Sequence, residues 1–220
     1  MMTFLSTAAA QTTENPFFQN YNTPHQTVPF HLIKNEHYLP AFQEGIRQHQ
    51  QEVEAIVNNP QPPTFKNTIE SLEYSGMLLE KVSGPFFNLL SAETNDELQD
   101  IAQQVSPLLT EHSNSVFLND KLFERVKAVY EKREKLKLNP EQKRLLEKTY
   151  ESFVNNGANL SEADKEIFRQ LTKELNLLTL QYGQNVLKET NQYNLLIKDK
   201  NQLAGLPEDV LTTLAENAEK

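Results

Sequence analysis

Apolar side chains recur along much of this chain at three- and four-residue steps, which is the spacing of one face of an α-helix. The longest such segment runs from Ser161 to Thr190 and carries one apolar stripe: Ile167, Leu171, Leu175, Leu178, Tyr182 and Val186. Without a break, this helix would be about 45 Å long, at about 1.5 Å per residue. A helix of that length is not stable alone, so we expect its stripe to pack along neighbouring helices.

The same periodicity predicts two helices in the first part of the chain. The first spans residues 35–57 and is stopped by the proline-rich segment 58–63. The second begins near Thr64, runs through Gly76 and either ends or kinks at Pro85, because proline cannot donate an intrahelical hydrogen bond.

Three further helices have recognisable start signals. The capping pattern Thr94-x-x-Glu97 begins one that should bend at Pro107. Another follows Asn119, and the next has Asn139 as its cap with Pro140 as its first residue. The long segment described above then opens on Ser161-x-x-Asp164, after a terminator at Gly157, and a last helix starts at Pro207.

These elements predict an all-α fold, a layered bundle of long antiparallel helices of which several are kinked at proline. Residues 11–34 hold three prolines among polar side chains and should form an extended arm on the surface, anchored by Phe17, Phe18 and Phe30. At most one short pair of β-strands is expected near residues 193–204, beginning with Tyr193–Ile197.

The first ten residues, MMTFLSTAAA, resemble the second half of a secretory signal peptide, because a short apolar run precedes Ala8-x-Ala10. A plain disordered N-terminus is the alternative, since the usual basic region is missing. We therefore expect a periplasmic or otherwise exported protein that starts near Gln11 after processing, with a cytoplasmic location as the alternative.

Charge and composition narrow the range of partners. The chain of 220 residues has a net charge of −9, which disfavours nucleic acid, and no cysteine, which excludes disulfides and thiolate metal ligands. Residues 119–148 carry ten Lys/Arg against six Asp/Glu, which we interpret as solvated helix faces, with an electrostatic patch that faces a substrate or partner as the alternative. No apolar run is long enough to span a bilayer, so we expect no membrane partner.

Candidate catalytic chemistry is absent from the sequence patterns. A helical zinc protease needs two histidines four residues apart with a glutamate after the first, and none of the five histidines has that neighbour: His25, His31, His37, His49 and His112. His112 lies in an apolar stripe and is expected to be a hydrogen-bonded residue at the edge of the core. We therefore assign no catalytic residue and no metal ligand, and the substrate-binding residues stay unknown.

Residues 83–91 are unusually rich in aromatic and aliphatic side chains, including Phe86 and Phe87. Two interpretations are open. The segment packs into the core at a kink, which is the commoner use of such residues, or it forms an apolar wall of a peptide-binding channel.

Several segments, taken in order, resemble the N-terminal region of the M3 family of zinc metallopeptidases, the thimet oligopeptidase-like enzymes. They begin at Asn15-Pro16-Phe17 and continue at residues 63–73, 88–95, 119–133, 139–157, 181–185 and 203–207. The bacterial peptidyl-dipeptidase branch fits best. The resemblance implies a helical protein with a deep channel, whose zinc is held downstream by a His-Glu-x-x-His motif and a later glutamate. That motif does not occur in these 220 residues.

The resemblance thus implies that residues 35–220 are the helical N-terminal region of a larger metallopeptidase whose catalytic part is absent. The expected role is scaffold and channel wall, inactive by itself and free of metal, with zinc in the parent enzyme. The expected partners are short peptide substrates and the missing C-terminal catalytic region. The parent would release C-terminal dipeptides or, alternatively, cleave internally. A different class remains open, an autonomous helical module that binds peptides or proteins.

Overall fold

The computed structural model describes residues 15–218, and this part of the chain is helical with no β-strand. The predicted all-α fold is therefore confirmed. The chain divides into two compact units, Met1–Leu178 and Thr179–Lys220, and the boundary falls inside the long helix α8 (Glu162–Gln192). Residues 1–10, where a signal-peptide remnant is predicted, lie outside the described range.

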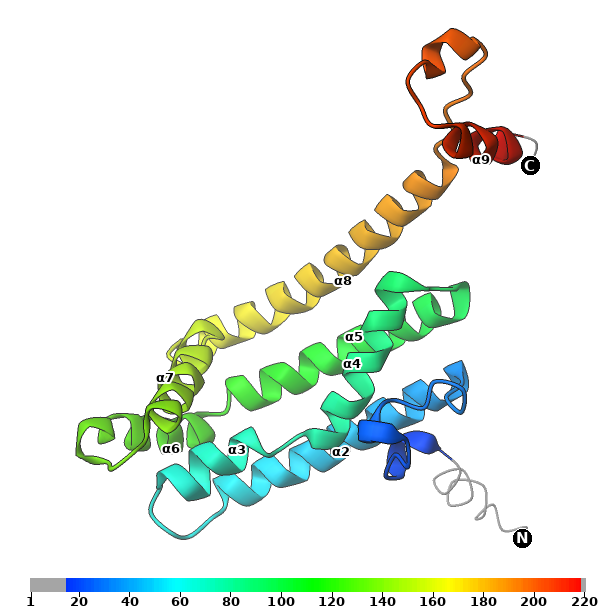
Figure 1. Ribbon diagram of the computed structural model, residues 1–220. Helices are drawn as coiled ribbons and strands as arrows, with labels where there is room; N and C mark the ends of the chain where they lie inside the picture. The colour runs from blue at the N-terminus through cyan, green and yellow to red at the C-terminus, as the bar shows by residue number, and fades with distance from the viewer. Residues whose placement is uncertain (1–14, 219–220) are drawn as a thin grey trace, which may run out of the picture. The chain divides into compact units, whose positions relative to one another are not determined.

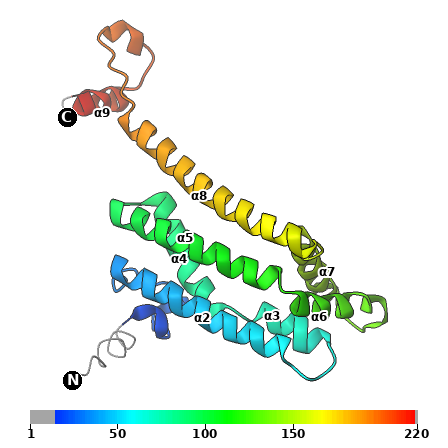
Figure 2. The same cartoon turned by 180° about the vertical axis from the view of Figure 1, so that it is seen from behind.

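The first unit is organised around helix α2 (Tyr38–Val57), which packs against α4 (Met77–Ala92) and α5 (Asp96–Phe117). Figures 1 and 2 show these three helices close together from opposite sides. Helices α6 (Asp120–Tyr130) and α7 (Pro140–Asn155) pack on each other, and α6 also contacts α2. Shorter elements complete this unit: η1 (Pro16–Phe18), η2 (Pro24–Gln26), η3 (Asn35–His37), η4 (Phe65–Glu70), α3 (Ser71–Glu73) and η5 (Arg133–Lys135).

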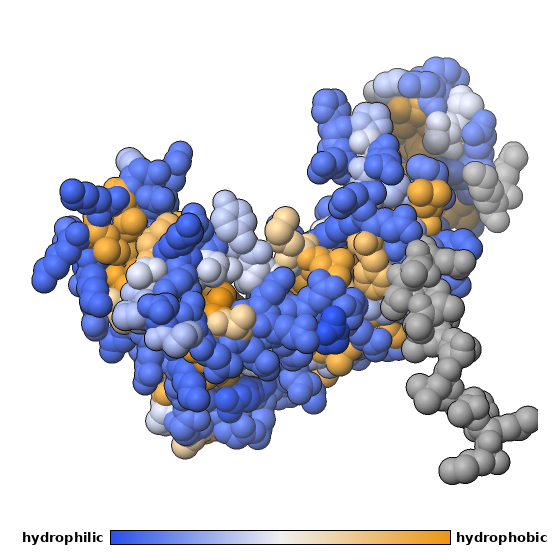
Figure 3. Space-filling model, turned by 90° about the horizontal axis from the view of Figure 1, so that it is seen from below, coloured by the Kyte–Doolittle hydropathy of each residue, from blue (hydrophilic) through white to orange (hydrophobic). Residues whose placement is uncertain are grey.

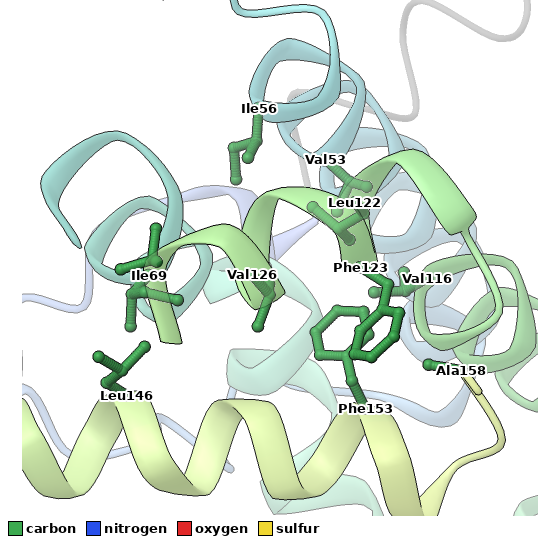
Figure 4. Packing of buried hydrophobic residues seen from close by; sticks show 11 residues of the cluster. Val53, Ile56, Ile69, Val116, Leu122, Phe123, Val126, Leu146, Phe153 and Ala158 are labelled. Carbon is green, nitrogen blue, oxygen red and sulfur yellow. The ribbon is translucent and has the colours of Figure 1, made fainter. Parts of the chain in front are cut away.

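Buried apolar side chains from five of these elements, α2, η4, α5, α6 and α7, form one core cluster. Polar residues cover most of the surface seen in Figure 3, where apolar patches interrupt them. Figure 4 shows the interior, in which side chains of α2, η4, α5, α6 and α7 meet: Val53, Ile56, Ile69, Val116, Leu122, Phe123, Val126, Leu146 and Phe153. Beside this cluster the rings of Tyr130 and Tyr150 stack with their centroids 3.9 Å apart and their planes 4° from parallel. That stack joins α6 to α7.

The predicted helix starts are confirmed where an asparagine or serine side chain accepts a backbone hydrogen bond. Asn119 caps α6 by accepting from the backbone N–H of Leu122, and Asn139 caps α7 by accepting from that of Gln142. The cap of α5 was predicted one residue early. Asn95, and not Thr94, accepts from the backbone N–H of Leu98, because the extended backbone that a cap needs falls at Asn95.

The single helix predicted from Thr64 through Gly76 is wrong. The chain instead forms the π-helical segment η4 and the short α3, and it breaks at Gly76, whose φ of 72° is left-handed. A side chain is disfavoured at that backbone geometry, and it would also strike the ring of His49, which lies 3.0 Å from an added Cβ. Helix α4 then begins after Gly76 and continues through Pro85 to Ala92.

The N-terminal arm docks through one buried aromatic ring. Phe17 is fully buried and its ring lies 5.2 Å from that of Tyr38, whereas Phe30, predicted as another anchor, is 49% exposed. The Lys81 ammonium donates hydrogen bonds to the carbonyl oxygens of Phe17 and Gln19, at 2.9 and 2.6 Å. Side chains of α2 and α4 therefore fix the start of the described chain.

The second unit contains the end of α8, an irregular segment, η6 (Lys200–Leu203) and α9 (Glu208–Ala218). At Tyr193–Ile197, where the sequence predicts at most a short strand, the described structure forms none. Residues 193–199 have no regular hydrogen-bonding pattern, since no second strand pairs with them in the part of the chain that the structure describes. Tyr193, Leu195 and Leu196 are each about two thirds exposed or more.

Candidate functional site

The outer face of α8 is the most unusual surface of the first unit. The stripe that the sequence predicts to be buried is instead exposed. Four of its residues lie in this unit, Ile167, Leu171, Leu175 and Leu178, and their exposed fractions are 55, 59, 62 and 54%. We call these four residues the α8 apolar face. Tyr182 and Val186, which continue the stripe in the second unit, are also exposed.

The face that α8 turns toward α5 is polar. The Asn114 side-chain amide of α5 donates a hydrogen bond to the Thr172 hydroxyl at 3.0 Å. One turn further along, the Asn176 amide donates to the Thr110 hydroxyl at 2.9 Å. Helix α8 is thus attached to the first unit through side-chain hydrogen bonds, while the α8 apolar face is left exposed. This is the reverse of the usual arrangement of a surface helix.

A buried ion pair fixes the beginning of α8. Lys165 is 1% exposed, and its ammonium donates a hydrogen bond to the carboxylate of Asp120, at the start of α6. It donates a second one to the carboxylate of Glu162, with Nζ and Oε1 2.8 Å apart. Lys165 is also the only buried residue of α8 among those that the structure describes. The N-terminal end of α8 is therefore held by charge, and not by apolar packing.

A hydrogen-bonded chain of side chains joins α2, α5 and the turn before α4. The Ser75 hydroxyl donates to the Leu72 carbonyl at 2.7 Å, so its oxygen must accept from Nε2–H of His49, 3.1 Å away. Nδ1 of a neutral His49 then carries no proton, and it accepts a hydrogen bond from Nε2–H of His112 at 2.8 Å. Both imidazoles are neutral in this arrangement. His112 is 5% exposed, which confirms its predicted position as a hydrogen-bonded histidine at the core edge.

This chain of side chains does not have the polarity of an activated nucleophile. A catalytic base would accept the serine proton, whereas here His49 donates to Ser75. Burial lowers the pKa of His49, and burial together with the neighbouring His49 lowers the pKa of His112 to about 4. Sequence reasoning missed the pairing because the two histidines are 63 residues apart, and periodicity carries no signal about such contacts.

The described residues 15–218 contain His, Asp and Glu side chains but no cysteine. Within that range no group of three or more His, Cys, Asp or Glu side chains is placed to hold a metal ion. Nε2 of His112 and Nδ1 of His49 are hydrogen-bonded to each other. The described residues therefore do not fit the zinc that the family resemblance implies for the parent enzyme.

One ring of the aromatic segment 83–91, that of Phe86, packs into the interior of the first unit. Phe86 is fully buried, with its ring 5.0 Å from that of Tyr38 and 5.2 Å from that of Phe42. It has no surface left with which to line a channel. Phe87 is 39% exposed, and the centre of its ring lies 6.3 Å from that of Phe42.

A cavity of about 850 Å³ lies between the arm and helices α2 and α4, lined by residues that include Phe17, Tyr21, Glu44 and Lys81. The Lys81 ammonium in this cavity already donates to two carbonyl oxygens and lies 4.0 Å from the centre of the Tyr21 ring. Its charge is thus used to hold the arm.

The basic stretch 119–148 forms solvated helix surfaces with local ion pairs, as in Arg144–Glu147 and Lys148–Glu151. Arg125 is the exception, because it is buried and donates to the carbonyl oxygens of Asn59 and Gln61. Among the described helices, none combines the length and apolar character needed to cross a membrane.

Comparison with known proteins identifies the relatives of this chain. It is 44% identical over 207 residues to a dipeptidyl carboxypeptidase of Escherichia coli, a match that covers 94% of this chain and 30% of that protein. It is 28% identical over 205 residues to oligopeptidase A of Salmonella typhimurium and 26% identical over 204 residues to a probable cytosolic oligopeptidase A of Arabidopsis thaliana. The chain is a homologue of the M3 peptidases.

The resemblance inferred from the sequence is therefore confirmed. The matches to the M3 relatives cover nearly all of this chain, whereas the chain spans only about 30% of the length of these relatives. A scan against models of protein families finds no match.

Proposed function

We propose that this chain is the non-catalytic, N-terminal helical part of a zinc metallopeptidase, in which it serves as scaffold and channel wall. The parent enzyme would hydrolyse short peptides and release C-terminal dipeptides. The observation that supports the proposal is the 44% identity to the Escherichia coli dipeptidyl carboxypeptidase over almost the whole chain.

The dipeptidase specificity is favoured over internal cleavage by the difference between relatives. Identity is 44 and 42% to two dipeptidyl carboxypeptidases, but 28% to the oligopeptidases A of Salmonella typhimurium and Escherichia coli. In the parent, zinc would polarise the scissile carbonyl and lower the pKa of a bound water. The residues described here would act by shaping the channel, which admits short unfolded peptides.

A segment exchange tests this function. The Escherichia coli enzyme is made with this chain in place of the 207 residues that match it, and a version lacking the segment serves as the control. We expect the exchanged enzyme to release dipeptides from peptides with a free C-terminus and not from those with a blocked C-terminus. The purified 220-residue chain alone should be inactive, and stoichiometric zinc in it would contradict the proposal.

The second candidate function is an autonomous helical binding module. The exposed apolar side chains of α8 could bind a separate protein or peptide as well as they could bind a further part of the same protein. The two are separated by sequencing the gene beyond Lys220. A reading frame that continues to a His-Glu-x-x-His motif supports the peptidase, and a stop codon supports the module.

We also propose that the protein is exported, on the basis of the Ala8-x-Ala10 pattern. Expression in a bacterial host followed by fractionation and N-terminal sequencing tests this. Periplasmic protein that begins near Gln11 is expected, and cytoplasmic protein that retains its first residues would support the alternative location.

A further inference from the structure

The α8 apolar face has the spacing of a helix that docks on another protein surface. Ile167, Leu171, Leu175 and Leu178 follow steps of four, four and three residues, so they lie along one side of three helical turns. Every one of them is more than half exposed. Anchors at this spacing are typical of a helix that inserts into an apolar groove of a partner.

Hydrogen bonds on the other side of α8 fix the helix, so the exposure of its apolar face is not due to a poorly attached helix. Lys165, Thr172 and Asn176 each make side-chain hydrogen bonds to α5 or α6, so the rotation of α8 about its axis is fixed. Turning the apolar residues inward would break these contacts and expose the Lys165 ion pair. The helix is therefore set with its apolar side outward.

The charges around the face argue against a membrane as its cover. Asp164 lies in line with the stripe and Glu174 beside it, whereas helices that lie on membrane surfaces carry Lys and Arg at such positions. Acidic residues at the rim instead complement a protein surface with basic side chains around an apolar groove.

We infer that the α8 apolar face is the surface on which the catalytic part of the M3 peptidase docks. The inference rests on the proposed function. This occupant is favoured because 70% of the length of the matched Escherichia coli dipeptidyl carboxypeptidase lies outside the segment that this chain matches. The four side chains of the face are each more than half exposed, so no other segment of the first unit covers them.

Cysteine labelling tests the inference, and the chain is suited to it because it has no native cysteine. Leu171→Cys places a thiol on the face. Lys173→Cys, two residues later on an exposed position away from the stripe, is the matched control. Each variant is studied as the free chain and within the exchanged Escherichia coli enzyme, with modification of each peptide quantified by mass spectrometry.

In the free chain we expect both thiols to react at similar rates. In the exchanged enzyme the Leu171→Cys thiol should react at least about tenfold more slowly, because reaction then requires the interface to open, while Lys173→Cys is unchanged. Equal reactivity of the two thiols in a cooperatively folded, active enzyme would overturn the docking inference and leave the proposed function standing. Protection of Leu171→Cys in a folded enzyme that releases no dipeptides would do the reverse.

Two other occupants are also decided by this experiment. If the Leu171→Cys thiol is already protected in the free chain and light scattering gives a dimer, a second copy covers the face and the inference is wrong. If protection in the free chain appears only when lipid vesicles are added, the occupant is a membrane surface and the inference is equally wrong.

Discussion

Nε2 of His112 lies 2.8 Å from Nδ1 of His49, and one of these two facing nitrogens must carry the shared proton. The hydrogen bonds of Ser75 determine which one, since they require His49 to donate from its other nitrogen. Nδ1 of His112 is left buried without a partner in the part of the chain that the structure describes. A proton added to either ring would therefore either break the shared bond or bury an unpaired charge.

This pair should make the first unit less stable in mild acid. The pKa of His112 is about 4 in the folded chain, lowered first by burial and then by His49, against about 6.5 for an unperturbed histidine. Below pH 6.5 the unfolded chain therefore binds more protons, so the free energy of unfolding falls as the pH is lowered toward 4. The loss from His112 amounts to about 3 kcal/mol at most.

Urea unfolding of the chain and of His112→Gln between pH 4 and 7.5 measures this effect. Glutamine still donates to His49 but does not titrate, so the pH dependence of its unfolding free energy should be shallower. His25→Gln, at an exposed position, is the matched control substitution. Parallel curves for the parent and His112→Gln would show that the buried histidine does not contribute.

Gly45 should not tolerate even a methyl group. A Cβ added there would lie 3.0 Å from the backbone Cα of Leu79, where α2 and α4 approach closely. We expect Gly45→Ala to lower the unfolding free energy by about 1–3 kcal/mol, because backbone atoms cannot move aside. Gly183→Ala, in the middle of α8, is the matched control, since a Cβ there meets nothing within 4 Å, and it should stabilise the helix by about 0.5–1 kcal/mol. A neutral Gly45→Ala in thermal unfolding would mean that the two helices can separate without cost.

Arg125 should stabilise the conformation of the proline-rich loop 58–63. Its guanidinium donates to the Asn59 carbonyl at 3.0 Å and to the Gln61 carbonyl at 3.4 Å. Arg125→Met leaves these carbonyls without the donor, and we expect a cost of about 1–3 kcal/mol and faster proteolysis within residues 58–63. Lys127→Met, on the exposed side of the same helix, should change stability by less than about 0.5 kcal/mol. Unchanged proteolysis of Arg125→Met would assign the loop's order to its prolines.

Removing the two carboxylate partners of the buried Lys165 should lower the unfolding free energy more than replacing Lys165 itself. Removing both partners, by Asp120→Asn together with Glu162→Gln, leaves a buried ammonium without a counter-charge and should destabilise by about 1–3 kcal/mol. Lys165→Met retains most of the packed volume, and its stability should stay within about 1 kcal/mol of the parent. Chemical unfolding in low salt compares the two, and the reverse order would show that the ion pair is a net source of stability.

Local signals in the sequence were sufficient for most of the helices. Asn119 and Asn139 cap the helices they were predicted to cap, since this chemistry involves residues only three positions apart. The break at Gly76 was missed, because the apolar spacing continues across it and the competing contact comes from His49.

The candidate sites were less predictable for a related reason. The contact between His49 and His112 depends on how α2 and α5 pack, which no local pattern records. The stripe on α8 correctly indicated a helix but not its burial. Periodicity shows that one side of a helix is apolar, and it does not show whether the surface that covers it belongs to the same segment of chain.

The stacked rings of Tyr130 and Tyr150 have a practical consequence for studying this protein. The chain contains no tryptophan, so tyrosine dominates its near-ultraviolet absorption and fluorescence. A parallel ring pair with centroids 3.9 Å apart is an asymmetric, immobilised chromophore at the junction of α6 and α7. Near-ultraviolet circular dichroism therefore offers a label-free optical report on whether those two helices are docked.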